Sequence, residues 1–561
     1  MSSNISIQKT EIRVIIVGAG LGGISAAIAL KGKLGFTNFQ IFEKASEVGG
    51  TWRDNNYPGC ACDVPVHWYS HSKELKPDWS TYYAEQPEIY EYWKFLAKKY
   101  GLYSKIQFNS NVCALIWNEE RQYWKAEVEH DGRKDSAIAE IVFLASGGLV
   151  LPGYASIKGI DSFEGPKFHS ARWDYNVDLR GKTVGVIGNG CSSAQFIPKI
   201  SEDPSVHVIN FCRTPSWIVP RTQFSYPTIV KLAFRWIPFL ARAHRNFLAC
   251  FTDLAFFIWV KRNVRLRNFA QKLLIRYMKK TAPKEYHDVL TPNYPMGCKR
   301  IIRDPGYYEA LNRPNVELVF GGVEEIVQDE IITGKGEKYK CDVLIFGTGF
   351  LFINPDVRIT GRGGQDLYEY FDSRGGPEAY IGTAVPGFPN IFTILGPNIA
   401  SGHVSAIFSE EQQILYALQL CKPIFEGKAK SFEVRRDVSE NYNVDLQRRL
   451  DETVWTSCHS YYRNGSSNSG KVVATFPGSL LRQWYITRKV NWDAFVGVEA
   501  ESWEKERKKQ KFLRTVRSVL FTFTFTGIAL YLWKGGLDLE KVSAAFNLVL
   551  NAVKERLKLG A

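Results

Sequence analysis

The chain has little of what marks a secreted, disulfide-stapled protein. Its N-terminal sequence, MSSNISIQKTEIR, contains no apolar core, so we expect no secretory signal peptide. Ten cysteines in 561 residues follow no regular spacing and do not form a disulfide framework. The sequence therefore predicts a reducing, cytoplasmic environment for the catalytic part of the protein.

A recognisable metal or dithiol motif is also missing. Cys60 and Cys62 form a C-x-C pair, whereas a redox-active pair favours C-x-x-C. A zinc site would need two further ligands, and none stands at a suitable spacing. We interpret both cysteines as structural and predict no metal site.

Acidic residues are nearly absent between Lys231 and Lys280, where twelve Lys and Arg accompany the single Asp253. The net charge of +14 would allow a nucleic-acid partner, but this segment is also rich in Phe, Trp and Leu. Basic amphipathic helices meet membranes or acidic surfaces more often than DNA. We predict no nucleic-acid partner. Two interpretations of the segment remain, a membrane-facing or acid-facing surface and solvated helix faces in a cap over the site.

Charge is absent from Ser518 to Trp533, directly after a strongly basic stretch. As a helix this run rises only about 24 Å, short of a bilayer core of about 30 Å. Flanking Arg517 and Lys534 and the aromatic end of the run suit an interface. The tail therefore predicts either membrane association, as an interfacial anchor rather than a span, or packing as a soluble helix. Beyond Gly535-Gly536, one further helical face is expected from Val542, Phe546, Val549, Val553 and Leu557.

The best-defined pattern present is a strand, a glycine turn and a helix start. Val14 to Val17 are apolar throughout, which predicts a strand buried on both faces of a parallel sheet. Gly18 permits the tight turn, Gly20 lets the backbone approach a pyrophosphate, and Gly23 lets the helix pack on the strand. The next predicted strand ends in Glu43, 20 residues beyond Gly23, where an acid binds ribose hydroxyls. This unit predicts an ADP-ribose site without a 2′-phosphate, as in FAD.

The same pattern recurs later in the chain. Thr183 to Ile187 predict a strand, and Ser193 occupies the third glycine position, so we expect helix and strand to lie slightly farther apart. The following strand leads into Arg213 rather than an acid, and a cation there suits a 2′-phosphate. This second unit predicts an NADPH site. Its turn and helix start are formed by Gly188, Asn189, Gly190, Cys191, Ser192, Ser193 and Gln195.

These two units predict an α/β fold with two Rossmann-like dinucleotide-binding domains, a helical insertion and a C-terminal hydrophobic helical tail. A strand at Asp342 to Phe346 would return the chain to the first domain. The expected order is a first FAD-binding part at 1–150, an NADPH-binding domain at 151–340 with the insertion at about 222–290, a second FAD-binding part at 341–500, and the tail at 501–561.

Three further motifs resemble those of the type I Baeyer–Villiger monooxygenases, within the superfamily of flavin-containing monooxygenases. A pattern F-x-G-x₃-H-x₃-W-D runs from Phe163 to Asp174 and fits that family's fingerprint. The stretch from Gly50 to Asp63 fits its second motif, and Tyr294 to Arg300 resembles the loop that carries its active-site arginine. The resemblance covers roughly residues 12 to 490, and the fungal-type members look most similar.

The resemblance implies an enzyme that uses FAD, NADPH and O₂. NADPH reduces the flavin, a C4a-peroxyflavin forms, and one oxygen atom enters a ketone to give an ester or lactone. It implies that Arg300 is a catalytic cation and that Asp63 fixes its position. His169 is expected to serve the coupling of the domains rather than to act as a base. The aromatic insertion favours a bulky apolar ketone, such as a secondary metabolite.

The resemblance also assigns cofactor contacts. Lys299 and Arg213 would bind the 2′-phosphate of NADPH, and Thr214, Ser192 and Gln195 would line its site. Val112 lies on a predicted strand near the adenine position. The residues expected to contact FAD in the second motif and beyond it are Gly50, Thr51, Trp52, Asp54, Asp63 and Tyr69.

Two other functions remain as alternatives. A flavin-dependent N- or S-oxygenase is disfavoured by Trp173-Asp174, since related enzymes of that kind usually carry Tyr or Phe at the Trp position. A membrane-peripheral nucleotide-binding protein without turnover would account for the basic insertion and the tail.

Overall fold

The computed structural model describes residues 12–351, 356–465 and 470–534. The chain forms two compact bodies, Met1–Lys422 with Phe432–Val496, and Pro423–Ser431 with Gly497–Ala561. The larger body contains both parallel sheets, and so both dinucleotide-binding units, and every residue that the sequence predicts for the site.

The first sheet is parallel and built around β1 (Val14–Val17), whose four residues are all buried. Its strand order is β21-β7-β1-β2-β3, so the order reverses at β1. In such sheets a ligand binds outside the carboxyl ends of the strands at this switch point, which here is Gly18. The other strands are β2 (Phe39–Phe42), β3 (Ile106–Gln107), β7 (Ile141–Leu144) and β21 (Ile391–Thr393).

The second sheet repeats this arrangement around β10 (Thr183–Ile187), with the order β14-β11-β10-β18-β9. All of its pairs are parallel. The predicted α/β fold with two Rossmann-like units is therefore confirmed. Its other strands are β9 (Lys167–His169), β11 (His207–Cys212), β14 (Val316–Phe320) and β18 (Val343–Phe346). The prediction that the strand at Asp342 to Phe346 returns the chain to the first domain is wrong, because β18 pairs with β10 and β9 and belongs to the second sheet.

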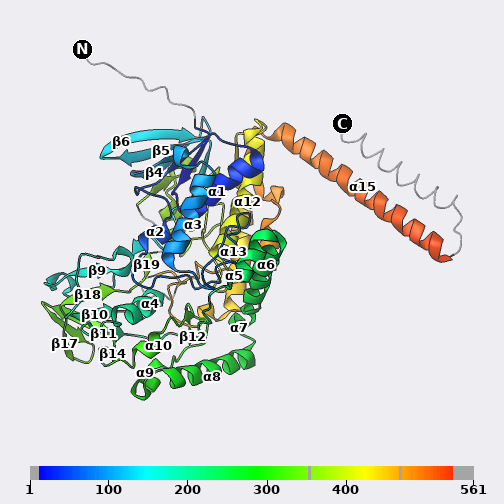
Figure 1. The fold of residues 1–561 in the computed structure, drawn as a ribbon. Helices are drawn as coiled ribbons and strands as arrows, with labels where there is room; N and C mark the ends of the chain where they lie inside the picture. Colours follow the sequence, from blue (N-terminus) through cyan, green and yellow to red (C-terminus); the bar gives the residue numbers. More distant parts are fainter. Residues whose placement is uncertain (1–11, 352–355, 466–469, 535–561) are drawn as a thin grey trace, which may run out of the picture. The chain divides into compact units, whose positions relative to one another are not determined.

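One helix follows each glycine turn, α1 (Leu21–Leu34) in the first unit and α4 (Cys191–Ile200) in the second. Where the chain crosses between the sheets, β8 (Leu151–Pro152) pairs antiparallel with β19 (Phe350–Leu351). The outward and returning segments thus lie side by side, and Figure 1 shows the two sheets on either side of this crossing.

Smaller sheets and helices complete the larger body. A four-stranded sheet has the order β20-β4-β5-β6, and a meander has the order β15-β16-β17. The strands are β4 (Ser110–Asn118), β5 (Tyr123–His130), β6 (Arg133–Ala139), β12 (Ile218–Val219), β13 (Ile302–Arg303), β15 (Val323–Val327), β16 (Glu330–Thr333), β17 (Lys338–Lys340) and β20 (Arg358–Thr360). The helices are α2 (Thr51–Asp54), α3 (Gln86–Lys99), α9 (His287–Leu290), α10 (Tyr307–Ala310), α11 (Leu367–Ser373), α13 (Arg436–Asp451) and α14 (Leu480–Thr487).

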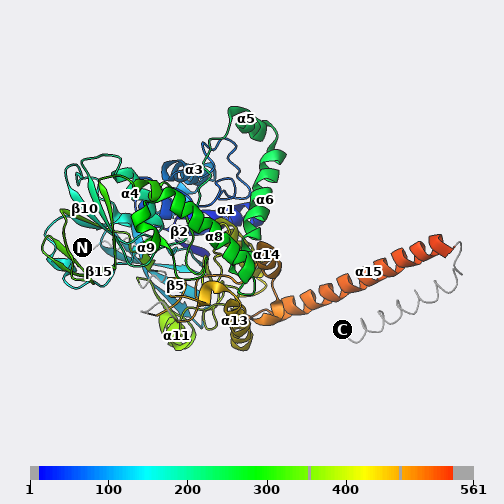
Figure 2. The ribbon, with the colours of Figure 1, turned by 90° about the horizontal axis from the view of Figure 1, so that it is seen from below.

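The predicted helical insertion consists of α5 (Thr228–Trp236), α6 (Pro238–Leu254), α7 (Phe256–Trp259) and α8 (Val264–Thr281). Each of these helices contacts the next one along the chain. Figures 1 and 2 show them in green, outside the two parallel sheets.

The uncharged run from Ser518 to Trp533 lies within α15 (Glu501–Lys534). Within the described ranges, no helix has both the length and the apolar character that crossing a bilayer requires. The helical face expected beyond Gly536 lies outside the described residues.

The cysteine prediction needs one correction. Cys298 and Cys458 form a disulfide, although 160 residues separate them, and the other eight cysteines are free. Spacing along the chain carries no signal for this pair, because only the fold brings the two Cα atoms to 6.1 Å. The cysteine pattern therefore no longer supports a reducing environment. Cys60 and Cys62 are free and buried, as expected of structural cysteines.

Candidate active site

A cavity opens at the carboxyl end of β1 and collects most of the residues that the sequence assigns to FAD. Three others lie outside its lining: Gly23 packs on the turn, while Trp52 and Asp63 are held nearby by other contacts. The predicted residues that do line it are Gly18, Gly20, Glu43, Gly50, Thr51, Asp54, Tyr69 and Val112.

The glycine turn of the first unit fits a bound pyrophosphate. Gly18 has φ +98°, a conformation that a side chain disfavours. A Cβ on Gly23 would lie 1.9 Å from the Gly18 carbonyl oxygen, so only glycine fits there. Gly20 caps α1 without any side-chain hydrogen bond, and the first N–H groups of the helix remain available for an anion.

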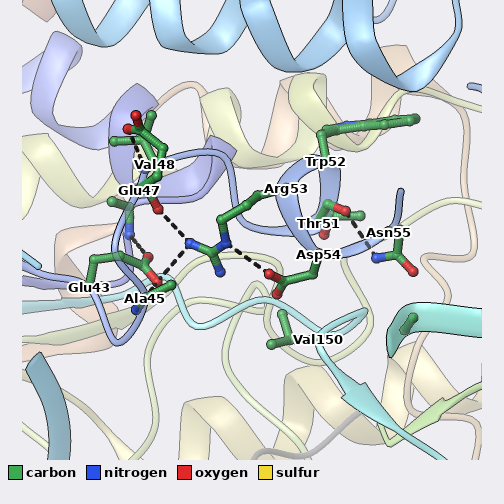
Figure 3. A network of polar contacts seen from close by, with 12 residues as sticks. Glu43, Ala45, Glu47, Val48, Thr51, Trp52, Arg53, Asp54, Asn55 and Val150 are labelled. Carbon is green, nitrogen blue, oxygen red and sulfur yellow. Dashed lines mark hydrogen bonds and ion pairs between the residues drawn. The ribbon is translucent and has the colours of Figure 1, made fainter. Parts of the chain in front are cut away.

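Glu43 is held rigidly beside this turn. Its Oε2 accepts from the backbone N–H of Ala19 at 2.7 Å, and its Oε1 accepts from that of Ala45 at 3.0 Å. Arg53 Nη1 lies 3.1 Å from Glu43, and Arg53 Nε donates to Asp54 at 2.8 Å, as Figure 3 shows. Arg53 therefore fixes both predicted acids. The sequence pattern did not single it out, although it stands between Trp52 and Asp54 in the second motif.

Trp52 contacts a residue that lines the cavity, although it does not line the cavity itself. Its Nε1 donates to the hydroxyl of Tyr69 at 3.2 Å, and the two rings meet edge to face. Tyr69, in turn, lines the cavity. Figure 3 also shows the side chain of Asn55 donating to the carbonyl of Thr51, at 3.0 Å. The short helix α2 is thus fixed by its own side chains, and Trp52 positions Tyr69.

Glu410 on α12 (Ala406–Phe425) also lines the cavity, and no sequence signal pointed to it. Its side chain is buried, and Oε2 has no hydrogen-bond partner among the described residues. Burial, reinforced by neighbouring Glu411, raises the pKa of Glu410 to about 8. The first-unit cavity therefore contains a carboxyl group that stays protonated at neutral pH.

The second glycine turn matches the first, with Gly188 at φ +106° and Gly190 capping α4 without a side-chain hydrogen bond. Ser193 is buried at the third position, and its Oγ faces Gly347. A Cβ on Gly347 would lie 1.9 Å from that oxygen. The missing side chain of Gly347 thus provides the space that the hydroxymethyl group of Ser193 occupies.

The strand register corrects the predicted equivalence of Glu43 and Arg213. Phe42 pairs with Val17 just before the first glycine turn, and Phe211 pairs with Ile187 just before the second. Cys212 therefore stands where the first unit has Glu43, and the predicted Arg213 lies one residue farther on. The small, fully buried thiol of Cys212 offers no group for a ribose diol.

Arg213 approaches Lys299, which comes from a distant loop. Burial lowers the pKa of Lys299, and the charge of Arg213 lowers it further. In the described part of the chain, no carboxylate forms an ion pair with either cation. Two neighbouring cations without a counter-ion fit a bound phosphate. The remaining predicted NADPH residues stand on either side, Asn189, Cys191 and Ser192 at the turn and helix start, and Thr214 next to Arg213.

Gln195 links the two units. Its Oε1 accepts from the hydroxyl of Tyr57 at 2.9 Å, and its Nε2 donates to the carbonyl of Ala61 at 2.9 Å. The predicted NADPH residue thus uses its side-chain amide to hold α4 against the loop that carries the second motif. If the side-chain amide of Gln195 also contacts NADPH, it must do so while it keeps its hydrogen bonds to Tyr57 and Ala61.

Arg300 and Asp63 form the pair that the resemblance implied. Arg300 donates to Asp63 Oδ2 from Nε at 3.0 Å and from Nη2 at 2.5 Å. Burial alone would raise the pKa of Asp63, but Arg300 and, more weakly, Arg303 hold it below its ordinary value. The charge of Asp63 raises the pKa of Arg300 well above its ordinary value. The site therefore contains a permanent, oriented cation.

The loop of Arg300 is anchored from several directions. Nη1 of Arg300 donates to the carbonyl of Gly402 at 3.3 Å. Next to Gly402, His403 Nε2 lies 3.0 Å from Asp253 Oδ1, which comes from the insertion helix α6. The disulfide of Cys298, two residues before Arg300, ties the same loop to Cys458. The sequence predicted none of these three contacts, because the two residues in each lie more than 100 positions apart along the chain.

His169 lies on β9, away from these groups. It is buried, and burial lowers its pKa to about 4, so the ring is neutral at physiological pH. Its Nδ1 accepts from the backbone N–H of Ala171 at 3.1 Å, and its ring contacts Tyr154 and Phe350 at the crossing between the sheets. His169 therefore lies where the chain crosses between the two sheets.

No group of three or more His, Cys, Asp or Glu side chains in the described ranges could hold a metal ion.

Comparison with known proteins identifies the family. Residues 11–251 match the model of the flavin-binding monooxygenase-like family. A Baeyer–Villiger monooxygenase of Pseudomonas aeruginosa is 38% identical over 86% of this chain and 91% of its own. An FAD-binding monooxygenase of Aspergillus niger is 33% identical over 93% of this chain and 88% of its own. The relatives thus include bacterial and fungal proteins.

The fold agrees with a solved structure of cyclohexanone monooxygenase from Rhodococcus bound to NADP⁺. That structure has a TM-score of 0.76 and 25% identity, and the match covers 88% of this chain and all of the other. The chain belongs to the flavin-dependent Baeyer–Villiger monooxygenases. It is an oxidoreductase whose cofactors are FAD and NADPH.

Proposed function

We propose that the Arg300–Asp63 pair carries the oxidation of a ketone to an ester or lactone, and that the ketone is bulky and apolar. The observation that supports this role is the pair itself, a fixed cation on the loop next to Lys299, with Asp63 from the motif loop of the first unit. FAD fits the first cavity and NADPH fits the second glycine turn. When bound, they supply hydride transfer and the activation of O₂.

The residues of this chain position and stabilise charge. Oxygen attack on a ketone develops negative charge, and a cation that is already oriented lowers the barrier without reorganising. Three N–H groups of Arg300 point to Asp63 and Gly402. Two of its five N–H groups therefore remain for the reacting oxygens. Asp63 keeps the guanidinium in place and receives a second contact at its carbonyl from Arg303.

The test is Arg300→Ala, compared with Arg300→Lys and with Arg358→Ala, an exposed arginine on β20, as the matched control. We expect ester formation from cyclohexanone and from bulkier ketones to fall by about a hundredfold or more in Arg300→Ala. NADPH should still reduce the flavin at close to the wild-type rate, measured by anaerobic stopped flow. Hydrogen peroxide should replace the ester. Lost flavin reduction with normal ester yield per reduced flavin would contradict this role.

The domain boundaries and the location of the protein belong to the same proposal. We assign the sheet around β1 to FAD and the sheet around β10 to NADPH. A cytoplasmic catalytic part with interfacial attachment through residues 518–533 is supported by the uncharged composition of that run and its basic flanks. Truncation before Glu501, followed by cell fractionation, tests the attachment. An unchanged distribution would remove the tail from the proposal.

A further inference from the structure

The insertion helices expose an unusual amount of apolar surface. Of the 31 large apolar side chains that are exposed in the described residues, 14 lie between Ile229 and Leu273. Ile229, Trp236 and Phe239 are 76%, 79% and 75% exposed. We call the exposed side chains of α5 to α8 the insertion surface. Contiguous exposed apolar groups of this kind mark interaction sites.

Helix α6 shows that this exposure is organised. One face of α6 packs inward through Ala241, Arg245, Leu248 and Thr252. A separate stripe of Leu240, Phe247, Phe251 and Leu254 is exposed at helical spacing. The rings of Phe247 and Phe251 stack on each other with centroids 6.2 Å apart. Helix α6 therefore has two faces, one that packs against the rest of the protein and a second, apolar face that is exposed.

Basic side chains accompany the apolar ones. On α8, Leu266, Phe269 and Leu273 form an exposed stripe at i, i+3 and i+7. Exposed cations on the same helix are Arg265, Lys272, Arg276, Lys279 and Lys280. None of these five cations forms an ion pair with a carboxylate of the described residues.

The single acid of α5 to α8 does not offset this charge. Asp253 Oδ1 is engaged by His403 and by the backbone N–H of Leu480, at 3.0 and 2.9 Å. The insertion surface is therefore apolar and uniformly basic.

We propose that the insertion surface docks on a lipid membrane that carries anionic headgroups. Aromatic and aliphatic side chains would enter the interface, and the cations would contact the headgroups. Charge complementarity favours this occupant. A second copy of the chain would present the same positive charge, and the stretch from Lys505 to Arg517 in the tail is basic as well.

The insertion helices contact the segment that holds the loop of Arg300. Asp253 of α6 contacts His403 next to Gly402, whose carbonyl accepts from Arg300. The ring of Trp259 on α7 also lies against His403, with centroids 5.6 Å apart. Docking would bring the site close to apolar ketones dissolved in the membrane, a consequence that rests on the proposed function. The binding itself does not depend on turnover.

Co-sedimentation of the FAD-loaded full chain with vesicles tests the proposal. We expect binding to phosphatidylcholine vesicles that contain phosphatidylserine, weaker binding to phosphatidylcholine alone, and loss of binding at high salt. Trp236→Ser/Phe239→Ser and Lys272→Glu/Arg276→Glu should each weaken binding by about tenfold or more. Val444→Ser/Leu481→Ser, which changes two similarly exposed residues on α13 and α14, should bind as the wild type does.

FAD content and ketone oxidation in vesicle-free solution control for folding of every variant. Unchanged vesicle binding by both insertion variants would overturn the proposal and place any attachment in the tail. A wild-type dimer in light scattering that the Trp236→Ser/Phe239→Ser variant converts to monomer would show instead that a second copy covers the surface. Failure of the proposed function would appear as absent ketone oxidation with intact vesicle binding.

Discussion

The two dinucleotide units share one scaffold and differ in what surrounds it. Both place a glycine with positive φ after a buried central strand, at +98° and +106°, and both begin the next helix at a glycine without a side-chain cap. Beyond this, the first unit presents Glu43 and the protonated Glu410. The second presents Cys212 at the position of Glu43, with Arg213 and Lys299 nearby.

This difference shows which part of the unit selects the nucleotide. The backbone N–H groups at the helix start are arranged alike in both units, because they bind a pyrophosphate whichever nucleotide carries it. The side chains after the second strand distinguish a ribose diol from a 2′-phosphate. In the first unit the acid is fixed by backbone N–H groups and Arg53. In the second, two cations approach each other with no described carboxylate as partner.

The largest expected effect on stability comes from a substitution at Gly23, the third glycine of the first turn. In Gly23→Ala the new Cβ would meet the Gly18 carbonyl, a backbone atom of the cofactor turn that cannot move aside. We expect a loss of about 3 kcal/mol or more of stability and loss of bound FAD. Urea unfolding and the flavin content of the purified protein measure this.

The matched change in the second unit is Gly347→Ala, where the clash is with the side chain of Ser193. It should cost about 2 kcal/mol alone, and Ser193→Gly in the same chain should restore most of that stability. A Gly347→Ala variant that Ser193→Gly does not rescue would contradict the packing described above.

Removing one cation from the second unit should have an intermediate effect. Arg213→Ala loses a charge-assisted contact to phosphate worth about 2 kcal/mol, so the KM for NADPH should rise by about thirtyfold. The KM for NADH should stay almost unchanged, because NADH lacks the 2′-phosphate. Arg180→Ala, at an exposed arginine before β10, is the control. Equal changes for both nucleotides would remove Arg213 from phosphate recognition.

The last expected effect depends on pH and, over a single pH unit, is smaller than the others; it concerns the acid of the first cavity. The pKa of Glu410 is raised to about 8 in the folded chain, against 4.5 as its ordinary value. Above its ordinary pKa, the unfolded chain releases this proton while the folded chain keeps it, so stability falls as pH rises. Glu410→Gln removes this penalty. Its advantage over the wild type should grow by about 1.4 kcal/mol per pH unit until the pH approaches the folded pKa.

Urea unfolding of both proteins across this pH range, at equal and saturating FAD, gives the slope. If the difference in stability between wild type and Glu410→Gln stays constant with pH, the carboxyl of Glu410 is ionised throughout this range. The first cavity would then lack the protonated carboxyl that distinguishes it from the second unit.

The strands and glycine turns were predictable because they depend on local rules. Four consecutive apolar residues before a glycine turn predicted β1, and the repeat of the strand, glycine turn and helix start predicted β10, each with the observed bounds. The motifs also named the two halves of the Arg300–Asp63 pair. Nothing local pointed to Glu410, which stands in an ordinary helical stretch, or to the disulfide of Cys298.

The sequence by itself therefore determined the two nucleotide-binding units, the family motifs and the excess of positive charge, because backbone conformation and composition are written in short stretches. Only the tertiary structure decided which residues meet. It paired Cys298 with Cys458, put Cys212 rather than Arg213 at the position in the second unit that Glu43 holds in the first, and gave Ser193 its space at Gly347. It also left the apolar residues of the insertion exposed. These outcomes depend on contacts between distant segments, which no pattern along the chain encodes.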